Sequence, residues 1–197
     1  VIAIGSQAEY GSNDFSVNEN TPERPNDAYG AVKTLTANYL RNLFERTLTQ
    51  WYWIRVFSIF GEGENPDWLF PYVISNLLKN KAVKLTLCEQ KYNYLYIDDF
   101  LNHLFPIVQS NVNKSGIYNI CDDESITISK ILEQVSDLMD VPRKLLQFGF
   151  LPYRHGQNMM IDGDNSKIKN TFSIDSQSFT GITNGLIKTI EYYKKLN

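Results

Sequence analysis

A tyrosine and a lysine stand four residues apart in the segment NDAYGAVKT, at Tyr29 and Lys33. On a helix this spacing places both side chains on one face, about one turn apart. A free phenol has a pKa of about 10, which is too high for ready proton exchange at neutral pH. A neighbouring ammonium favours the phenolate and so lowers that pKa. The pair can therefore act as a general acid or base. Taken alone it is also compatible with chance, because the chain contains 12 Tyr.

A serine hydroxyl is the next group that chemistry could use. The chain opens with VIAIGS, residues 1–6, which has the pattern of a fully buried parallel strand whose carboxyl end enters a loop. Open parallel sheets bind ligands at that end. We therefore expect Ser6 at the ligand-binding edge of a sheet, where its hydroxyl can bond a substrate oxygen.

A helix must hold the tyrosine and the lysine. Apolar residues recur at helical intervals from Asp27 to about Leu48, and Asn26 or Asp27 is a suitable N-cap. Residues 51–60, WYWIRVFSIF, predict one buried strand. Strand, helix and strand in this order indicate a βαβ unit in a parallel sheet.

Further elements follow, and one loop separates the first strand from the helix. The loop over 11–26 is rich in Asn, Ser, Pro and Glu, and we expect its acidic part, 18–23, to be a solvated surface. A Ser/Thr-rich start predicts a capped helix over 125–140. The other expected helices cover 67–80, 98–108 and 182–196, and the other expected strands cover 83–87, 94–97 and 116–121.

Composition limits the class of protein. With 197 residues, 43% hydrophobic and 13% aromatic, the chain is typical of a folded globular protein of one domain or somewhat more. A net charge of −3 provides no basic field for nucleic acid or an anionic membrane surface. Two cysteines without paired spacing favour a reducing, cytoplasmic setting over disulfides or zinc. His103 and His155 lack partners at metal-ligand spacing, so packing or surface roles are favoured and no metal site is predicted.

Several segments together resemble the extended short-chain dehydrogenase/reductase family that acts on nucleotide sugars. In that family a Ser or Thr stands four residues before a Tyr-Gly pair, and a YxxxK helix follows. Here Ser6 precedes Tyr10 and Gly11 at that distance, and Tyr29 and Lys33 fill the helix motif. The later segments that resemble the family, in the same order, are RVFSIFGEG, YLYIDDF, GIYNI and LPYRHGQNMMIDGDNSKIKN.

The resemblance implies catalytic roles for three residues. Tyr29 would exchange a proton with a sugar oxygen while hydride moves to or from nicotinamide. Lys33 would tune Tyr29 and hold the nicotinamide ribose, and Ser6 would bond the same sugar oxygen. Phe57 falls where the family contacts nicotinamide, so the cofactor contacts implied are Tyr29, Lys33 and Phe57, with NADP or NAD as the cofactor.

The resemblance also implies substrate contacts, with two departures. Ser58 stands where the family usually has an Asn that touches substrate. A family Arg falls on Tyr92, and the neighbouring Lys91 is the candidate to replace its charge. Arg154 would pair with the nucleotide diphosphate, since a guanidinium fork suits phosphate oxygens. The carboxylates Asp98 and Asp99, by the same resemblance, would cap a helix rather than take part in catalysis.

The fold implied is α/β: a partial Rossmann-like doubly wound parallel sheet, its N-terminal half missing, with a small α+β substrate-binding lobe. Residues 1–60 would be the C-terminal part of the dinucleotide-binding domain. Residues 61–197 would be mainly the substrate-binding lobe, with 94–121 returning to the sheet. The Gly-rich pyrophosphate turn of such domains has no counterpart in this sequence, so we expect either a longer natural chain or a fragment. Residues 1–6 would then form an exposed sheet edge.

The reaction follows in part from two positions after Ser6. Dehydratases of the family carry Asp-Glu there, and this sequence has Gln7 and Ala8, which disfavours dehydration. The residues of these motifs resemble those of 4-ketoreductases that make deoxysugars for surface polysaccharides. We therefore favour NAD(P)H-dependent reduction of a nucleotide-linked 4-keto-6-deoxy sugar. A nucleotide-sugar 4-epimerase and a noncatalytic sugar-nucleotide-binding remnant remain alternatives, and pairing of the Tyr29 helices in the family suggests a homodimer.

Overall fold

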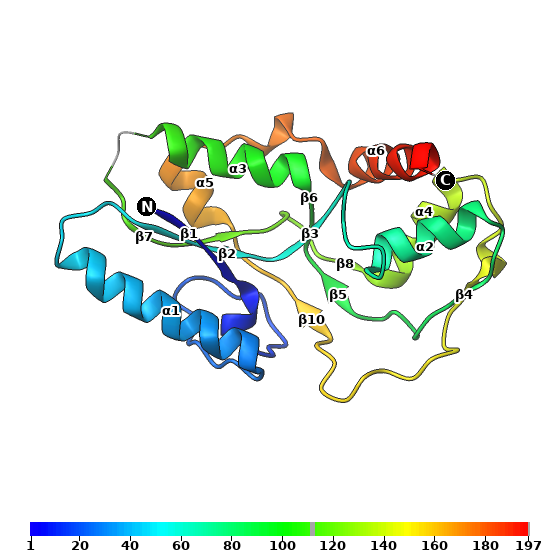
Figure 1. Ribbon diagram of the computed structural model, residues 1–197, viewed down its shortest axis with the longest axis horizontal. Helices are drawn as coiled ribbons and strands as arrows, with labels where there is room; N and C mark the ends of the chain where they lie inside the picture. The colour runs from blue at the N-terminus through cyan, green and yellow to red at the C-terminus, as the bar shows by residue number, and fades with distance from the viewer. Residues whose placement is uncertain (111–112, 197) are drawn as a thin grey trace.

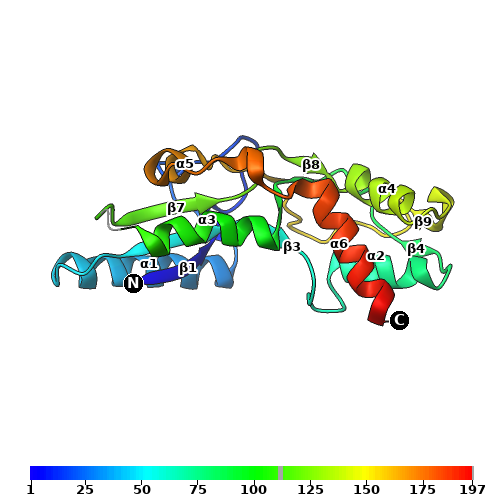
Figure 2. The same cartoon turned by 90° about the horizontal axis from the view of Figure 1, so that it is seen from above.

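The computed structural model describes residues 1–110 and 113–196. The expected ranges 94–121 and 61–197 therefore include residues 111, 112 and 197, which lie outside the described part. A parallel sheet occupies one end of the molecule, with α1 on one side and α3 and α5 on the other (Figure 1). A second layer of helices, α2, α4 and α6, lies at the opposite end from α1 (Figure 2).

The main sheet has the order β1-β2-β7 and is parallel throughout. Its strands are β1 (Ile2–Ser6), β2 (Tyr52–Val56) and β7 (Gly116–Ile120), and Ser6 pairs with Val56 at their carboxyl ends. The helix α1 (Ala28–Glu45) joins β1 to β2, which confirms the predicted βαβ unit. Asp27 is its N-cap, because Oδ1 accepts a hydrogen bond of 2.7 Å from Gly30 N.

The first strand is the edge of this sheet. Val1 and Ile4 are 57% and 46% exposed, so the predicted full burial is wrong for the chain as it stands. The expectation of an exposed sheet edge at residues 1–6 is confirmed.

Residues 51–60 do not form the single strand predicted. The chain leaves the main sheet after Val56, and β3 (Ser58–Phe60) pairs instead with β6 (Tyr94–Tyr96). Phe57 lies at the break, where its N–H still donates to Ile120 O over 3.1 Å. Its buried ring packs so closely on Gly163 that a Cβ there would lie 2.4 Å from it. This buried aromatic contact redirects the backbone between the two sheets.

The remaining elements either cover the main sheet, as α3 and α5 do, or form the second layer. The largest apolar core lies between α2, α4 and α6, around Phe70, Leu77, Ile131, Leu132 and Leu186. The helices are α2 (Leu69–Leu78), α3 (Ile97–Gln109), α4 (Ile128–Leu138), α5 (Ser166–Phe172) and α6 (Gly181–Leu196). The short strands are β4 (Val83–Lys84), β5 (Lys91–Tyr92), β8 (Ile126–Thr127), β9 (Leu146–Gln147) and β10 (Met160–Ile161). No helix in the described residues is long and apolar enough to cross a bilayer.

Two capping predictions are borne out in part. Thr127 is the N-cap of α4, but its side chain makes no capping hydrogen bond. The carboxylate of Asp99 accepts bonds from Thr180 N and Gly181 N at 2.7 and 2.9 Å, so it caps a helix as expected, and that helix is α6. Asp98 pairs with Lys188 at 3.1 Å, also on α6. Both carboxylates join α3 to α6, in keeping with the structural role expected of them.

The turn after β3 predicts a pH effect. Burial raises the pKa of Glu64 to about 7, although its Oε1 accepts a bond of 2.8 Å from Gly61 N. The native protein therefore binds an extra proton between pH 4.5 and about 7, and the free energy of unfolding falls as pH rises through that range. We expect Glu64→Gln, which keeps the acceptor, to be more stable than wild type above pH 7 in urea unfolding, and to lose that advantage below pH 4.5. The exposed-helix variant Glu191→Gln is the control, and an equal gain in it would contradict the assignment.

Candidate active site

Two of the three predicted catalytic side chains meet beside β1. Lys33 Nζ lies 5.7 Å from the centre of the Tyr29 ring. The same ammonium donates a hydrogen bond of 2.8 Å to the carbonyl oxygen of Ile4. An ammonium has three N–H donors, so Lys33 keeps donors for another group. Tyr29 itself is 57% exposed, and its phenol is accessible to a ligand.

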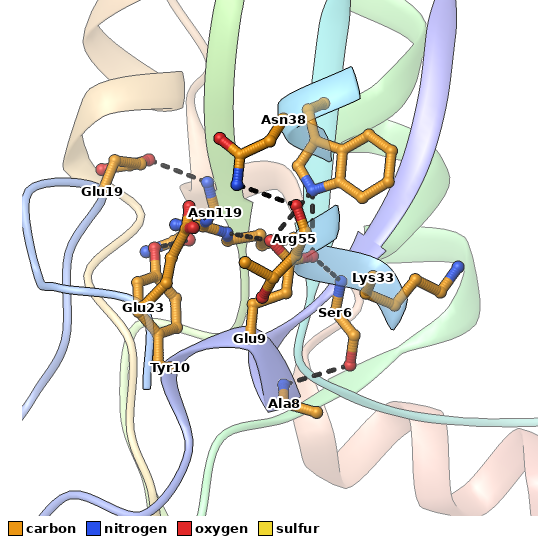
Figure 3. Close-up of polar contacts among 12 residues, drawn as sticks. Ser6, Ala8, Glu9, Tyr10, Glu19, Glu23, Lys33, Asn38, Arg55 and Asn119 are labelled. Atoms are coloured by element: carbon orange, nitrogen blue, oxygen red, sulfur yellow. Dashed lines mark hydrogen bonds and ion pairs between the residues drawn. The ribbon is translucent and has the colours of Figure 1, made fainter. Parts of the chain in front are cut away.

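Ser6 ends β1 and caps the short 3-10 helix η1 (Gln7–Tyr10). Its Oγ accepts a bond of 3.1 Å from Ala8 N, and its own N–H donates to Glu9 Oε1 over 2.9 Å (Figure 3). These reciprocal bonds form a capping box. Because Oγ acts as an acceptor here, its O–H remains available to donate to a substrate oxygen.

The turn of Ser6 and the start of α1 are in close contact. A Cβ on Gly30 would lie 2.4 Å from the carbonyl oxygen of Ala8, which is shorter than any real carbon–oxygen contact of this kind. Gly30 directly follows Tyr29, so the missing side chain allows the phenol-bearing turn to pack against the serine-bearing turn. The structure thus brings Ser6, Tyr29 and Lys33 to one edge of the parallel sheet.

A buried ionic network lies beneath this edge (Figure 3). Glu9 is fully buried and accepts bonds from Trp53 Nε1 at 2.9 Å and from Arg55 Nε at 2.7 Å. Arg55, 1% exposed, also pairs with Glu23 and stacks 4.4 Å from the Tyr10 ring centre. Burial acts to lower the pKa of Arg55, but its contacts with Tyr10 and Glu9 outweigh burial and raise it. The sequence analysis did not predict this network. The one signal for it in the sequence is a charged residue, Arg55, inside an apolar strand.

The acidic loop is part of the network, so its predicted role as a solvated surface is wrong. Glu19 Oε1 accepts a bond of 2.8 Å from Asn119 N, and burial raises the pKa of Glu19. Glu23, as above, pairs with Arg55. Tyr10 donates from its hydroxyl to Asn119 Oδ1 over 2.8 Å, and burial raises its pKa to about 12. Tyr10 is therefore a buried structural phenol, whereas Tyr29 is exposed.

The predicted substrate contacts fall in different places. Arg154 lines a groove of about 450 Å³ together with Lys84, Tyr72 and Gln90. Lys91 lines a different groove, beside Lys130 and Asp122. The structure therefore does not bring Lys91 and Arg154 to one groove.

Three further predicted contacts are partly or wholly buried. The ring of Phe57 is buried and, with Gln7 and Tyr10, lines a narrow cavity. Ser58 is half-buried at the start of β3. Tyr92 is buried and donates from its hydroxyl to Asn158 O over 2.7 Å. Each of these residues can form part of the wall of a binding site, and none of them offers a charged group to a ligand.

His103 has the packing role that its sequence context favoured. It is buried on α3, where Nδ1 lies 2.9 Å from the carbonyl oxygen of Asp99. Its ring meets Phe179 edge to face, with centres 4.8 Å apart. Within residues 1–110 and 113–196 no three His, Cys, Asp or Glu side chains gather as metal ligands would.

Comparison with known proteins identifies relatives of this chain. The model of the NAD dependent epimerase/dehydratase family matches residues 1–121. The chain is 24% identical over 139 residues to dTDP-4-dehydro-6-deoxyglucose reductase of Escherichia coli, which covers 68% of the chain and 44% of that protein. It is 27% identical over 82 residues to CDP-abequose synthase of Salmonella muenchen, covering 41% of the chain and 28% of that protein.

Solved structures extend the likeness in fold to the whole chain. UDP-glucuronic acid 4-epimerase of Bacillus cereus, in complex with UDP-glucuronic acid and NAD, has a TM-score of 0.89 at 21% identity. The match covers 100% of this chain and 62% of that one. The chain thus spans less than two thirds of the length of these relatives.

The contact between Gly30 and Ala8 gives a test of the site's packing. Gly→Ala inside a helix ordinarily stabilises by about 1 kcal/mol. Here we expect Gly30→Ala to destabilise by about 1–3 kcal/mol, because the added methyl meets a backbone carbonyl that cannot yield. Urea unfolding measures the change, with Asn42→Ala on the exposed side of the same helix as control. A stabilised Gly30→Ala protein would contradict the close packing of the two turns.

Proposed function

Since the chain belongs to the NAD-dependent epimerase/dehydratase family, we propose that it carries the catalytic part of an NAD(P)H-dependent reductase of nucleotide-linked 4-keto-6-deoxy sugars. The observation that carries the proposal is the meeting of the Ser6 turn with the Tyr29–Lys33 face of α1 at the carboxyl end of a parallel sheet. That edge is where open α/β sheets bind their ligands. Deoxysugar synthesis for surface polysaccharides is the setting we infer for this reaction.

The chemistry requires a proton donor and an oriented oxygen. Tyr29 donates its phenolic proton to the sugar oxygen as the carbonyl becomes an alcohol, and the Lys33 ammonium balances the phenolate that is left. Ser6 donates its hydroxyl hydrogen to the same oxygen and polarises the carbonyl. A bound nicotinamide cofactor supplies the hydride in this chemistry.

The residues present fit such a cofactor. Lys33 uses one N–H on the Ile4 carbonyl and retains donors for ribose hydroxyls. Tyr29 is exposed beside it, and the buried Phe57 forms part of the wall of the neighbouring cavity. We assign residues 1–60, with β7 returning beside β2, to the cofactor-binding part and most of 61–197 to the substrate-binding lobe.

The sugar nucleotide is assigned by charge. We propose that Arg154 pairs with the diphosphate in the groove that it lines with Lys84, because these two cations outnumber the one carboxylate there, that of Asp67. Lys91 faces another groove and takes no part in this assignment. Ser58 and the buried Tyr92 would line the substrate side without charge.

Two considerations favour reduction among the reactions of the family. Dehydration needs an additional acid and base after the serine, and Gln7 and Ala8 provide neither, with the N–H of Ala8 already bonded to Ser6. Two of the relatives are dTDP-4-dehydro-6-deoxyglucose reductase and CDP-abequose synthase, which supports a similar substrate class here. A nucleotide-sugar 4-epimerase is the second candidate, because the same three side chains serve it and the fold likeness includes such an enzyme.

The proposal predicts a specific loss of activity. The full-length protein, mixed with NADPH and 4-keto-6-deoxy nucleotide sugars, should consume NADPH, measured by absorbance. We expect Tyr29→Phe to lower kcat by about 10²–10⁴-fold because the proton donor is lost. Lys33→Ala should be severely impaired and Ser6→Ala less so, whereas Tyr39→Phe on the same helix is the control.

The outcomes separate the candidates. Sugar interconversion without net NADPH consumption would identify the epimerase. No turnover and no cofactor binding would support the binding remnant, and full activity in Tyr29→Phe would refute the assigned roles.

We also propose a homodimer formed through α1. Large apolar side chains on this helix remain exposed at successive turns, at Val32, Leu35, Tyr39 and Leu43, with exposed fractions of 61, 70, 68 and 42%. An exposed apolar stripe of this kind marks an association surface, and a second copy can pair with it through a two-fold axis.

The dimer proposal predicts a change of mass in solution. We expect Leu35→Glu to convert the full-length protein to a monomer in sedimentation experiments, because the charge would be buried between apolar helices. Leu87→Glu, at an exposed leucine outside α1, should leave the dimer intact. A monomeric wild type at micromolar concentration would refute the proposal.

A further inference from the structure

Arg55 joins the two segments that carry the reacting groups. It lies on the central strand β2 and is buried, with Nε donating to Glu9 Oε2 at 2.7 Å and Nη2 paired with Glu23. Glu9 belongs to the turn that begins at Ser6, whereas Glu23 belongs to the loop that leads into the helix of Tyr29. One guanidinium therefore contacts carboxylates from both segments, Glu9 and Glu23 (Figure 3).

The carboxylate of Glu9 transmits this contact to the serine. Its Oε1 accepts the N–H of Ser6 at 2.9 Å, while the other oxygen accepts from Arg55. Its main-chain carbonyl accepts the N–H of Arg24, the residue after Glu23, at 3.1 Å. The backbone of Ser6 and the loop before Tyr29 are thus held by neighbouring atoms of one network.

The shape of the guanidinium matters for this arrangement. Its planar fork has several donors in fixed directions, so it can bind two carboxylates from different segments at once. A lysine ammonium carries the same charge without the fixed fork. Buried ion pairs are also often replaceable by apolar groups without loss of stability, so stability alone does not account for two carboxylates around one buried cation.

We propose that Arg55 is a positioning residue: by binding Glu9 and Glu23 together, it sets the separation between the Ser6 hydroxyl and the Tyr29 phenol so that both reach one sugar oxygen. This role rests on the proposed function. It assigns to Glu9 and Glu23 the task of transmitting the position of Arg55 and places neither of them in contact with substrate.

The test combines single variants with a double-mutant cycle in the full-length protein. Glu23→Gln removes the charge of the outer carboxylate, whose side chain is 25% exposed, and Arg55→Lys keeps the charge and removes the fork. We expect each to lower kcat about tenfold or more with KM nearly unchanged, since small misplacements of reacting groups have large effects on rate. In a Ser6→Ala background the loss from Glu23→Gln should shrink to less than about twofold, because the group being positioned is gone.

Glu133→Gln is the matched control. Glu133 lies on α4 and forms an exposed pair with another arginine, Arg143, beyond the end of that helix, so its loss should leave kcat at the wild-type value. The same variants serve for either reaction, followed by NADPH absorbance for reduction or by sugar interconversion for epimerisation, since both need Ser6 and Tyr29 on one oxygen.

Each outcome decides the proposal. An unchanged kcat in folded Glu23→Gln, or an equal loss with and without Ser6, would overturn it. Failure of Glu23→Gln to fold while Glu133→Gln folds would also overturn it, because the ion pairs would then maintain the fold and not the site. If Arg55→Lys alone fails to fold, Glu23→Gln carries the test. A wild type with neither activity would overturn the proposed function, and the role with it, before any variant is compared.

Discussion

A full positive charge on the central strand of the main sheet needs a counter-charge inside the protein, because Arg55 is out of contact with water. Glu9 and Glu23 supply it from the two segments that flank the site. Movement of the Ser6 turn would separate the buried Glu9 from Arg55, which is strongly unfavourable, and movement of the loop would remove the second carboxylate, Glu23, from the same guanidinium. The position of Ser6 relative to the loop before Tyr29 is therefore fixed by electrostatics as well as by packing.

The rest of the site follows from topology once these segments are fixed. Parallel pairing of β1 with β2 places Ser6 at the carboxyl edge of the sheet, and the crossover helix returns Tyr29 to the same edge. The missing side chain of Gly30 permits the close approach of helix and turn, and Lys33 ties the helix to the first strand through the Ile4 carbonyl. Local chain geometry and a buried ion pair thus act on the same few residues.

The sequence was informative where local pattern decides structure. Helical periodicity and the N-cap Asp27 predicted α1, and the strand–helix–strand order predicted parallel pairing, both as observed. The spacing of Tyr29 and Lys33 predicted a shared face, which their 5.7 Å contact bears out. The resemblance to nucleotide-sugar enzymes was needed to give that face a reaction.

Contacts between distant segments could not be predicted in this way. Glu23 has the composition of a solvated loop, and only the fold places it on Arg55, 32 residues away in sequence. The division of 51–60 between two sheets depends on the packing of Phe57 against Gly163, which no local pattern encodes. Lys91 and Arg154 likewise line different grooves, a separation set by how distant segments pack and not by local pattern.

The central claim is that a serine and a tyrosine from these two segments act on a single substrate atom. A crystal structure of the full-length protein with nicotinamide cofactor and a 4-keto-6-deoxy nucleotide sugar measures it directly. We predict Ser6 Oγ and Tyr29 Oη at hydrogen-bond distance, about 2.6–3.2 Å, from the same sugar oxygen. A bound sugar whose reacting oxygen contacts only one of them, or neither, would contradict the account.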